Sequence, residues 1–342
     1  MDSTRLIPCN IQAGDKWKWL DFVDGGNGFL YGIPFYAKRV VYFNPDDKSI
    51  MAIGPDLGGG YGKYCSGIRA DNGSIYCVPN GTQYFLKITP MMGKGGDCKI
   101  EILKDRKLPW NGINLWRVGA LAKDGCIYYL PYSGKHILKL DTVNNDTVSL
   151  VKIDLGHKRY EGAVLGTDGC IYGMPCIGAT GIFNAGIHIM KFNPVDKSIC
   201  NVGGKLDPEI RFEGGLVAAE DGNIYGASVA GQIFHIDPIS NKFSITGNKI
   251  YGGDNGWGPP VIGEDKCIYF APNNHDRILK YNPSTQTISF VGDSFKDKRR
   301  KWYGAVSASD GFIYCVPCND SKILQIDARH INEKILEVLE TM

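Results

Sequence analysis

A tyrosine that recurs seven times at nearly constant spacing is the feature that most constrains how this 342-residue chain can fold. Around it runs the motif Asp-Gly-x-Ile-Tyr-x-x-Pro, most complete at 124–131, 168–175 and 310–317. A repeat of this length indicates an architecture in which each copy is one supersecondary unit. Subtraction gives gaps of 44 to 53 residues between the successive copies Tyr31, Tyr76, Tyr128, Tyr172, Tyr225, Tyr269 and Tyr314.

Each copy predicts four short antiparallel strands. A first strand of small residues ends in an Asp-Gly or Asn-Gly turn, which is a strong hairpin signal. The second strand holds the tyrosine and stops near the proline, which cannot donate to a sheet ladder. A third strand ends near Asn-Pro or Asp-Pro, and a fourth follows. We therefore predict an all-β, seven-bladed β-propeller of four-stranded antiparallel blades. Small residues in the first strands favour it over a linear solenoid, because innermost strands crowd around an axis.

The repeats predict one propeller domain over residues 5–328. After Asp327 the last copy departs from the pattern, and apolar residues at helical spacing predict a short C-terminal helix over 329–342. Blade seven then lacks a fourth strand, and an N-terminal strand over 5–11 is the candidate that closes the ring without an open edge. The blades are expected near 17–55, 61–106, 114–153, 158–203, 212–248, 255–293 and 300–328.

The apolar third-strand runs complete a pattern that resembles a known group of propellers. Together with the Asp-Gly-x-Ile-Tyr motif, they resemble the blades of streptogramin-lyase-like and related YVTN/NHL-type propellers from about Trp17 to Asp327. The resemblance implies the architecture only, since such propellers include lyases, lactonases, lectins and interaction platforms. Streptogramin lyases use a His/Glu pair with Mg²⁺, and no matching motif places that pair here. The runs are 137–141, 233–238, 278–283 and 323–327.

The composition says more about the cellular environment of the protein than about its activity. A formal net charge of +2 provides no global field for nucleic acid. No apolar stretch approaches the ~18 residues of a membrane-spanning helix, and the opening residues lack the build of a secretory signal. Cys126, Cys170 and Cys267 share one repeat position, so these cysteines are expected to be small buried hydrophobic residues, and the eleven cysteines are expected to be free thiols. We expect a cytoplasmic protein without membrane insertion; the oligomeric state stays open.

Aromatic residues and cations alternate where the loops of a propeller gather around the channel mouth. Such a ring predicts binding of an anionic small ligand, an acidic glycan or an acidic protein segment through charge neutralisation and cation–π contacts. The alternative is that the aromatics pack between blades and the cations are solvated. Twelve residues before the repeat tyrosines lie Trp19, Tyr64, Trp116, Tyr160, Trp257 and Trp302, with Phe212 displaced by one. The cations are Lys18, Lys63, Arg117, Arg159, Arg211 and Lys301.

Two further features suggest chemistry at this mouth. Residues 176–187 form an insertion in blade four, in which Phe183 is placed to cap a ligand. His157 and His275 fall in loops of this face and are the candidate acid/base groups.

A metal site is the third feature. Glu161 and Glu213 occupy equivalent places in adjacent blades and, with Asp254, could hold Mg²⁺ or Ca²⁺, although such ions want more oxygen ligands.

The leading prediction is a non-catalytic binding propeller for an anionic ligand or protein segment, which needs no cofactor. A metal-assisted lyase or lactonase-like hydrolase is the alternative, and it alone requires a divalent cation. A structural subunit of a larger assembly, using the blade rim and the C-terminal helix, is the third hypothesis.

Overall fold

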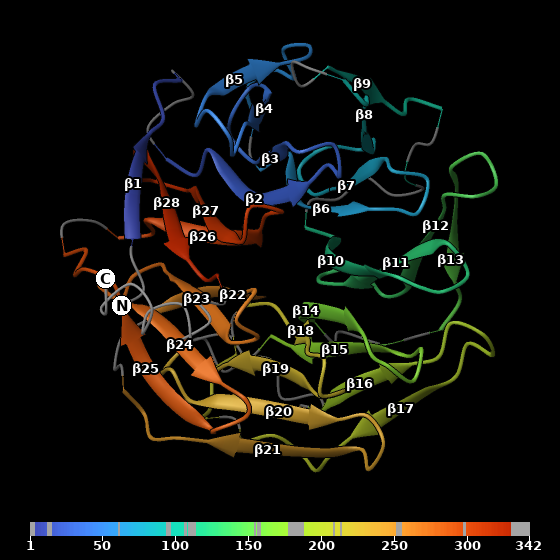
Figure 1. Cartoon of the computed structure of the whole chain (residues 1–342). Helices are drawn as coiled ribbons and strands as arrows, with labels where there is room; N and C mark the ends of the chain where they lie inside the picture. Colours follow the sequence, from blue (N-terminus) through green and yellow to red (C-terminus); the bar gives the residue numbers. More distant parts are fainter. Residues whose placement is uncertain are drawn as a thin grey trace.

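Seven sheets of four antiparallel strands are arranged around one axis in the computed structural model (Figure 1). The predicted seven-bladed propeller is therefore confirmed, while the predicted C-terminal helix lies outside the described residues. The structure describes residues 4–11, 16–60, 62–93, 97–105, 108, 114–153, 155, 159–176, 188–207, 209–212, 214–250, 255–296 and 299–329.

Each blade runs from an inner strand to an outer strand in chain order, except the last. Blade one contains β2 (Trp19–Asp24), β3 (Leu30–Pro34), β4 (Val40–Phe43) and β5 (Ile50–Ile53); blade two contains β6 (Tyr64–Arg69), β7 (Ile75–Pro79), β8 (Leu86–Pro90) and β9 (Cys98–Ile102). Blade three contains β10 (Trp116–Leu121), β11 (Cys126–Pro131), β12 (Ile137–Asp141) and β13 (Thr147–Val151); blade four contains β14 (Tyr160–Leu165), β15 (Ile171–Pro175), β16 (Ile189–Phe192) and β17 (Ile199–Val202). Blade five contains β18 (Val217–Ala218), β19 (Ile224–Ala227), β20 (Ile233–Asp237) and β21 (Lys242–Thr246); blade six contains β22 (Trp257–Ile262), β23 (Ile268–Pro272), β24 (Ile278–Asn282) and β25 (Thr287–Val291). Blade seven contains β26 (Trp302–Ser307), β27 (Phe312–Pro317), β28 (Lys322–Asp327) and β1 (Thr4–Pro8).

The N-terminal strand completes the last blade. β1 pairs antiparallel with β28 in a register that sets Thr4 opposite Ile326 and Pro8 opposite Lys322. Figure 1 shows β1 at the outer edge of this sheet. The pairing closes the ring, because the two ends of the described chain share one blade and leave no unpaired β28 edge.

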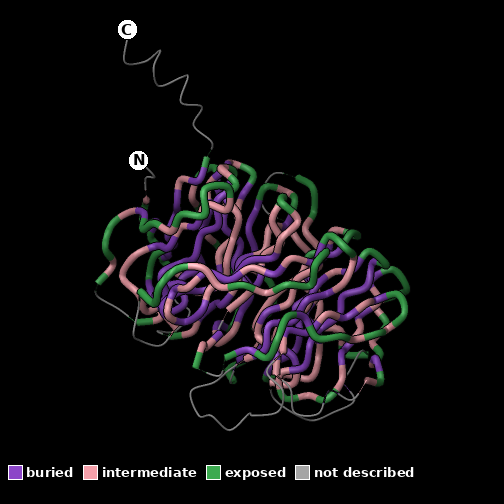
Figure 2. Tube along the Cα trace, turned by 90° about the horizontal axis from the view of Figure 1, so that it is seen from below, coloured by how far each residue is buried: buried purple, intermediate pink, exposed green. Residues whose placement is uncertain are grey.

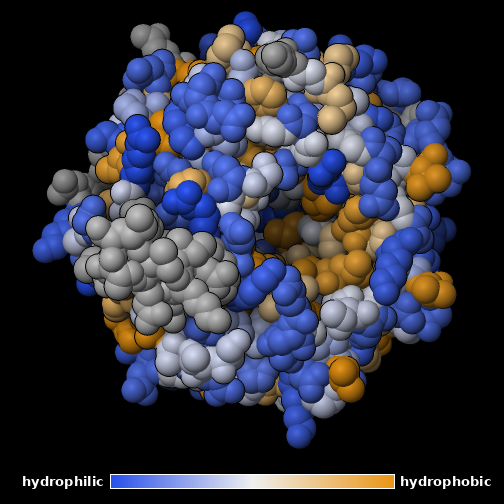
Figure 3. Space-filling model, viewed as in Figure 1, coloured by the Kyte–Doolittle hydropathy of each residue, from blue (hydrophilic) through white to orange (hydrophobic). Residues whose placement is uncertain are grey.

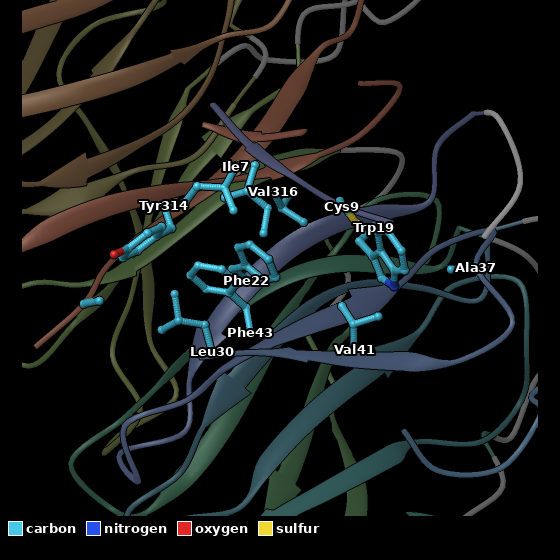
Figure 4. Close-up of a cluster of buried hydrophobic side chains, with 12 residues drawn as sticks. Ile7, Cys9, Trp19, Phe22, Leu30, Ala37, Val41, Phe43, Tyr314 and Val316 are labelled. Carbon is cyan, nitrogen blue, oxygen red and sulfur yellow. The ribbon is translucent and has the colours of Figure 1, made fainter. Parts of the chain in front are cut away.

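Apolar side chains fill the spaces between neighbouring blades. Between blades seven and one, Trp19 and Phe43 meet Ile7, Tyr314 and Val316 in one buried cluster (Figure 4). Buried residues run through the interior of the disc, and exposed ones follow its rim and turns (Figure 2). This face-to-face packing of sheets explains why each blade repeats a large aromatic residue in its first strand.

The hydroxyl group explains why tyrosine, and not phenylalanine, recurs in the second strand of each blade. In five blades the buried tyrosine donates to the aspartate four residues earlier, at 2.6 to 2.9 Å. In blades one and two Asn27 and Asn72 take that place and donate to the hydroxyls of Tyr31 and Tyr76 at 3.0 Å. A buried phenol needs a hydrogen-bond partner, so the aspartate or asparagine of the turn and the tyrosine recur together.

All eleven cysteines are free thiols, and Cys315 and Cys318 are both buried. The described part of the chain contains no helix with the length and apolar character that crossing a membrane requires.

Candidate functional site

Two sets of loops gather at one end of the channel and form a collar. For blades one, two, three and seven, the connection that enters the blade is tied by its backbone to the loop between the second and third strands of the preceding blade. The Lys63 amide donates to Phe35 O at 2.8 Å, and the Lys301 amide donates to Asn273 O at 3.1 Å. The Lys18 amide likewise donates a hydrogen bond to Cys318 O, at 3.2 Å. The loops that the sequence assigned to one face therefore do lie together.

A cavity of about 590 Å³ extends from this collar into the channel. Its volume falls within the roughly 300–1,000 Å³ of typical small-ligand sites. Seen from the side of the disc opposite the collar, the ring also has a hollow at its centre, with apolar residues along part of its wall (Figure 3). Trp17, Phe35, Tyr36, Asn80 and Asn114 line the cavity from the collar. Asp21, Cys65, Arg117, Glu161 and Tyr303 line it from the innermost strands.

An irregularity at the start of the first strand supplies most of the chemistry of this wall. In six blades the register between the first and second strands shifts just after the repeat aromatic residue. A β-bulge inserts an extra residue and re-aims a side chain. We name the residues after the repeat aromatics the bulge residues; those that line the cavity are Leu20, Cys65, Arg117, Glu161 and Tyr303.

An ion pair joins two bulge residues across neighbouring blades. Arg117 Nη1 donates to Glu161 Oε1 at 2.8 Å, and the two side chains are 30% and 14% exposed. The Arg117 guanidinium lies 3.8 Å from the centroid of the Tyr132 ring, and that of Arg159 lies 5.2 Å from it. Burial raises the pKa of the Cys65 thiol to about 12, so this cysteine stays protonated at neutral pH. The pair holds a planar cation in a fixed orientation at the cavity wall.

Asp21 is a second carboxyl group in the cavity. Its Oδ2 accepts a long hydrogen bond of 3.4 Å from the Gly67 amide. Burial raises the pKa of Asp21 to about 7, against the lowering effect of the Gly67 and Phe22 amides. The group therefore titrates near neutrality. Asp21 was not among the predicted site residues, although an aspartate between the apolar residues Leu20 and Phe22 of a first strand was the available signal.

The aromatic residues predicted to contact a ligand lie between blades instead. The indole N–H of Trp116 donates to His136 O at 2.9 Å, and that of Trp302 donates to Lys322 O at 2.8 Å, each twenty residues ahead in the same blade. We therefore assign these aromatics to packing, because their side chains are absent from the cavity wall. The set is only 1–4% exposed and comprises Trp19, Tyr64, Trp116, Tyr160, Trp257, Trp302 and the displaced Phe212.

Three of the predicted cations are also structural. Lys18, Lys63 and Lys301 are 2–6% exposed. Their ammonium groups donate to carbonyl oxygens of the preceding blade: Lys18 to Asp320 O at 2.5 Å, Lys63 to Tyr36 O at 3.3 Å, and Lys301 to His275 O at 2.9 Å. These lysines stabilise the collar and present no free charge to the cavity. Arg159 and Arg211, at the entries to blades four and five, are half-buried.

The candidate acid/base and metal residues are only partly placed. The His275 ring stacks on Trp257 at 4.3 Å and on Phe290 at 5.2 Å, outside the cavity wall. Burial lowers the pKa of His275, and its Nδ1 accepts the Arg277 amide at 3.0 Å. Within the part of the chain that the structure describes, no three metal-ligating side chains form a cluster. Glu161 is paired with Arg117. His157, Phe183, Glu213 and Asp254 lie outside the described residues.

Three aromatic residues that the prediction did not include line the collar. Phe35 and Tyr36 stack with ring centroids 4.9 Å apart, and Trp17 lies 6.0 Å from Phe35. The Arg300 guanidinium covers the Trp17 ring at 4.3 Å. The available signal was local: Phe35 follows the repeat proline Pro34, at the point where the blade reaches the collar.

Comparison with known proteins identifies the architecture. No protein-family model and no curated protein sequence matches the chain. A streptogramin B lyase superposes with a TM-score of 0.70 at 14% identity, covering 95% of this chain and 97% of that one. A virginiamycin B lyase from Staphylococcus aureus, solved with quinupristin, gives 0.71 at 14% identity, with 96% and 99% covered. YCF48 bound to the D1 peptide gives 0.67 at 12% identity, with 96% of each covered. Such low identities show the fold alone, and the predicted architectural resemblance is confirmed.

Proposed function

We propose that this protein is a binding propeller that takes an anionic ligand or an acidic protein segment at the collar end of its channel. The proposal rests on one observation: a ligand-sized cavity has the Arg117 guanidinium in its wall, and this group stacks on the Tyr132 ring, which the Arg159 guanidinium also approaches. Arginine on an aromatic face still offers its edge N–H groups to a carboxylate or phosphate.

Preorganisation supports this assignment. Arg117 is already fixed by Glu161 and Tyr132, so a ligand spends little entropy on ordering its side chain. Each cation–π contact contributes about 0.5–2 kcal/mol. Glu161 offsets part of the charge of Arg117, and Arg159 and Arg211, half-buried where the chain enters blades four and five, are further cations of this face.

Two structural neighbours accord with this use of the fold. YCF48 was solved bound to the D1 peptide, and the virginiamycin B lyase was solved with quinupristin. These two neighbours support a binding role, and the cations of the collar are the reason for proposing an anionic ligand.

The test is fluorescence anisotropy with a fluorescein-labelled hexaglutamate peptide. Neutralising both rim arginines, as Arg159→Gln with Arg211→Gln, should weaken binding by about tenfold or more at low salt, because rim charges govern encounter. The difference should shrink at about 500 mM salt, where charges are screened. Lys123→Gln with Lys242→Gln removes two exposed cations elsewhere and is the matched control. Equal binding by the rim variant and the wild type would refute the proposal.

A metal-assisted lyase or lactonase-like hydrolase is the second candidate, and Asp21 favours it. A carboxyl group with a pKa of about 7 suits general acid–base catalysis at neutral pH. Glu161 would have to exchange its Arg117 partner for the metal. Calorimetric titration with Mg²⁺, Ca²⁺ and Mn²⁺ tests this function: binding that Glu161→Gln abolishes supports it, and no heat at millimolar metal contradicts its metal-dependent form.

A further inference from the structure

One position of the collar has a left-handed backbone conformation, and in two blades it is occupied by a large residue that this conformation does not favour. The residue two before the repeat aromatic has a left-handed backbone in five blades, with φ between 38° and 57°. Gly62, Asn114 and Asn255 occupy it in blades two, three and six, and glycine and asparagine adopt this conformation at little cost. Trp17 and Arg300 occupy it in blades one and seven, at φ of 51° and 56°. Bulky side chains here are strained, so their presence indicates a role beyond the turn.

These two residues contact each other. The Arg300 guanidinium lies 4.3 Å from the centroid of the Trp17 ring, across the boundary between blades seven and one. Both backbones are fixed in the same way: the Trp17 amide donates to Asn319 Oδ1 at 2.8 Å, and the Arg300 amide donates to Asn274 Oδ1 at 2.9 Å. The pair is therefore a rigid cation–aromatic platform at the edge of the cavity.

Two further rings extend this platform. Trp17, Phe35 and Tyr36 all line the cavity and remain partly exposed. The Tyr36 amide donates to Trp17 O at 3.0 Å, and the Phe35 amide donates to Lys18 O at 3.0 Å. The two loops are thus joined by their main chains before any ligand arrives. Three partly exposed rings beside one guanidinium form a wall suited to a flat apolar group that carries a nearby negative charge.

Asn80 supplies a specific polar contact to the same wall. It is 4% exposed and lines the cavity. Its Nδ2 donates to Gly62 O at 2.8 Å, which fixes the orientation of the amide. Its buried Oδ1 has no donor within the described part of the chain. An unsatisfied buried acceptor is costly, and a ligand N–H would satisfy it.

We propose that Trp17, Phe35, Tyr36, Asn80 and Arg300 form a subsite for an aromatic residue within an acidic peptide segment. The ligand ring packs against the exposed parts of these three aromatic side chains, and a neighbouring carboxylate pairs with Arg300. A backbone N–H of the ligand donates to Asn80 Oδ1. This inference rests on the proposed function and selects, among anionic ligands, a peptide in which an aromatic residue adjoins acidic ones.

The test compares two peptides, acetyl-Glu-Glu-Phe-Glu-Glu-amide and acetyl-Glu-Glu-Ala-Glu-Glu-amide, by isothermal titration calorimetry. Wild-type protein should bind the Phe peptide about tenfold more tightly, because only that peptide fills the aromatic wall. Trp17→Asn installs the residue that blades three and six carry at this position, so the backbone is satisfied and the fold is kept. In this variant the Phe advantage should fall to about twofold or less. Trp17→Phe keeps a ring and should retain most of the advantage.

The outcomes separate the two proposals. Equal affinity of wild-type protein for both peptides, or an unchanged Phe advantage in Trp17→Asn, refutes the subsite and leaves the proposed function standing. Binding of neither peptide by wild-type protein refutes the proposed function and the subsite with it. Loss of the Phe advantage in Trp17→Asn but not in Trp17→Phe supports the subsite.

Discussion

At the scale of single residues, adjacent positions in the first strand serve different purposes. The repeat aromatic faces the neighbouring blade and is buried, as Trp116 is at 1% exposure. The residue after it, Arg117, lines the cavity. The register shift between Trp116 and Val118 separates these two roles. Packing residues must therefore repeat, whereas bulge residues are free to differ and to carry chemistry.

Removing a repeat aromatic should reduce stability without touching the cavity. Trp116→Ala should lower the free energy of unfolding by about 3–5 kcal/mol, because it leaves a large space between blades two and three. Urea unfolding followed by circular dichroism measures this. Tyr132→Ala, a half-buried ring on the loop face, is the control and should lose far less. A loss below about 1 kcal/mol for Trp116→Ala would contradict its assignment to packing.

Asp21 should make stability depend on pH. Its pKa is about 7 in the folded protein and 3.8 as an unperturbed group, so the unfolded chain ionises first. Stability from this group is complete below about pH 4 and is lost as pH rises to about 7. Asp21→Asn removes the ionisable group, so the stability of the variant relative to wild type should grow between pH 4.5 and pH 8. We expect a gain of about 2 kcal/mol, less than the full pKa difference implies, because solvent in the channel weakens the penalty on the charged carboxylate.

Urea titrations of both proteins at the two pH values measure this difference. Asp71→Asn, in an exposed turn, is the matched control and should show no such trend. A constant difference between Asp21→Asn and wild type across this range would show that the carboxyl titrates at its ordinary pH.

Two of the side chains that line the cavity, Arg117 and Glu161, were predicted from the sequence, whereas Asp21, Cys65 and Tyr303 were not. Spacing alone placed Trp19 and Lys18 near the mouth, yet a shift of one residue in a strand reverses the face that a side chain presents. The bulge that turns Arg117 and Glu161 inward leaves no composition signal of its own. The buried role of Lys301 was equally hidden, because it depends on carbonyl groups of another blade.

At the scale of elements, the sequence was more informative. Hairpin turns and strand-ending prolines defined the blades, because these residues act through local backbone geometry. The absence of a fourth strand after Asp327 pointed to the N-terminal segment, and β1 occupies that place. Collar loops such as that of Trp17 carry no periodic pattern, so their side-chain positions depended on contacts between blades.

The closing strand should show a two-residue period in its sensitivity to charge. Ile7 is 4% exposed and packs between blades seven and one, whereas Leu6 is 37% exposed on the same strand. Ile7→Asp should lower the free energy of unfolding by about 3 kcal/mol or more, since it buries an unpaired charge. Leu6→Asp is the matched control and should stay within about 1 kcal/mol. Thermal unfolding of both variants measures the contrast, and similar losses for the two would mean that β1 does not pack as described.

At the scale of the whole molecule, the cavity belongs to the ring and not to any blade. Asp21, Cys65, Arg117, Glu161 and Tyr303 come from blades one, two, three, four and seven. A ligand that touches several of them recognises the closed ring only. With a net charge of +2, the chain as a whole attracts polyanions weakly, so specific capture must come from this assembled geometry.

Binding of the acidic Phe peptide should therefore stabilise the ring as a whole. A ligand that binds only the folded state adds about 2.7 kcal/mol at 100 times its Kd, which should raise the Tm by a few degrees. The unfolded chain keeps its lysines and arginines but loses the cavity, so non-specific attraction to charge would give little or no shift. Differential scanning fluorimetry with and without peptide distinguishes these cases, and the Arg159→Gln, Arg211→Gln variant should show a smaller shift at the same concentration. Binding by anisotropy without any rise in Tm would mean that the peptide recognises the charge of the chain and not the closed propeller.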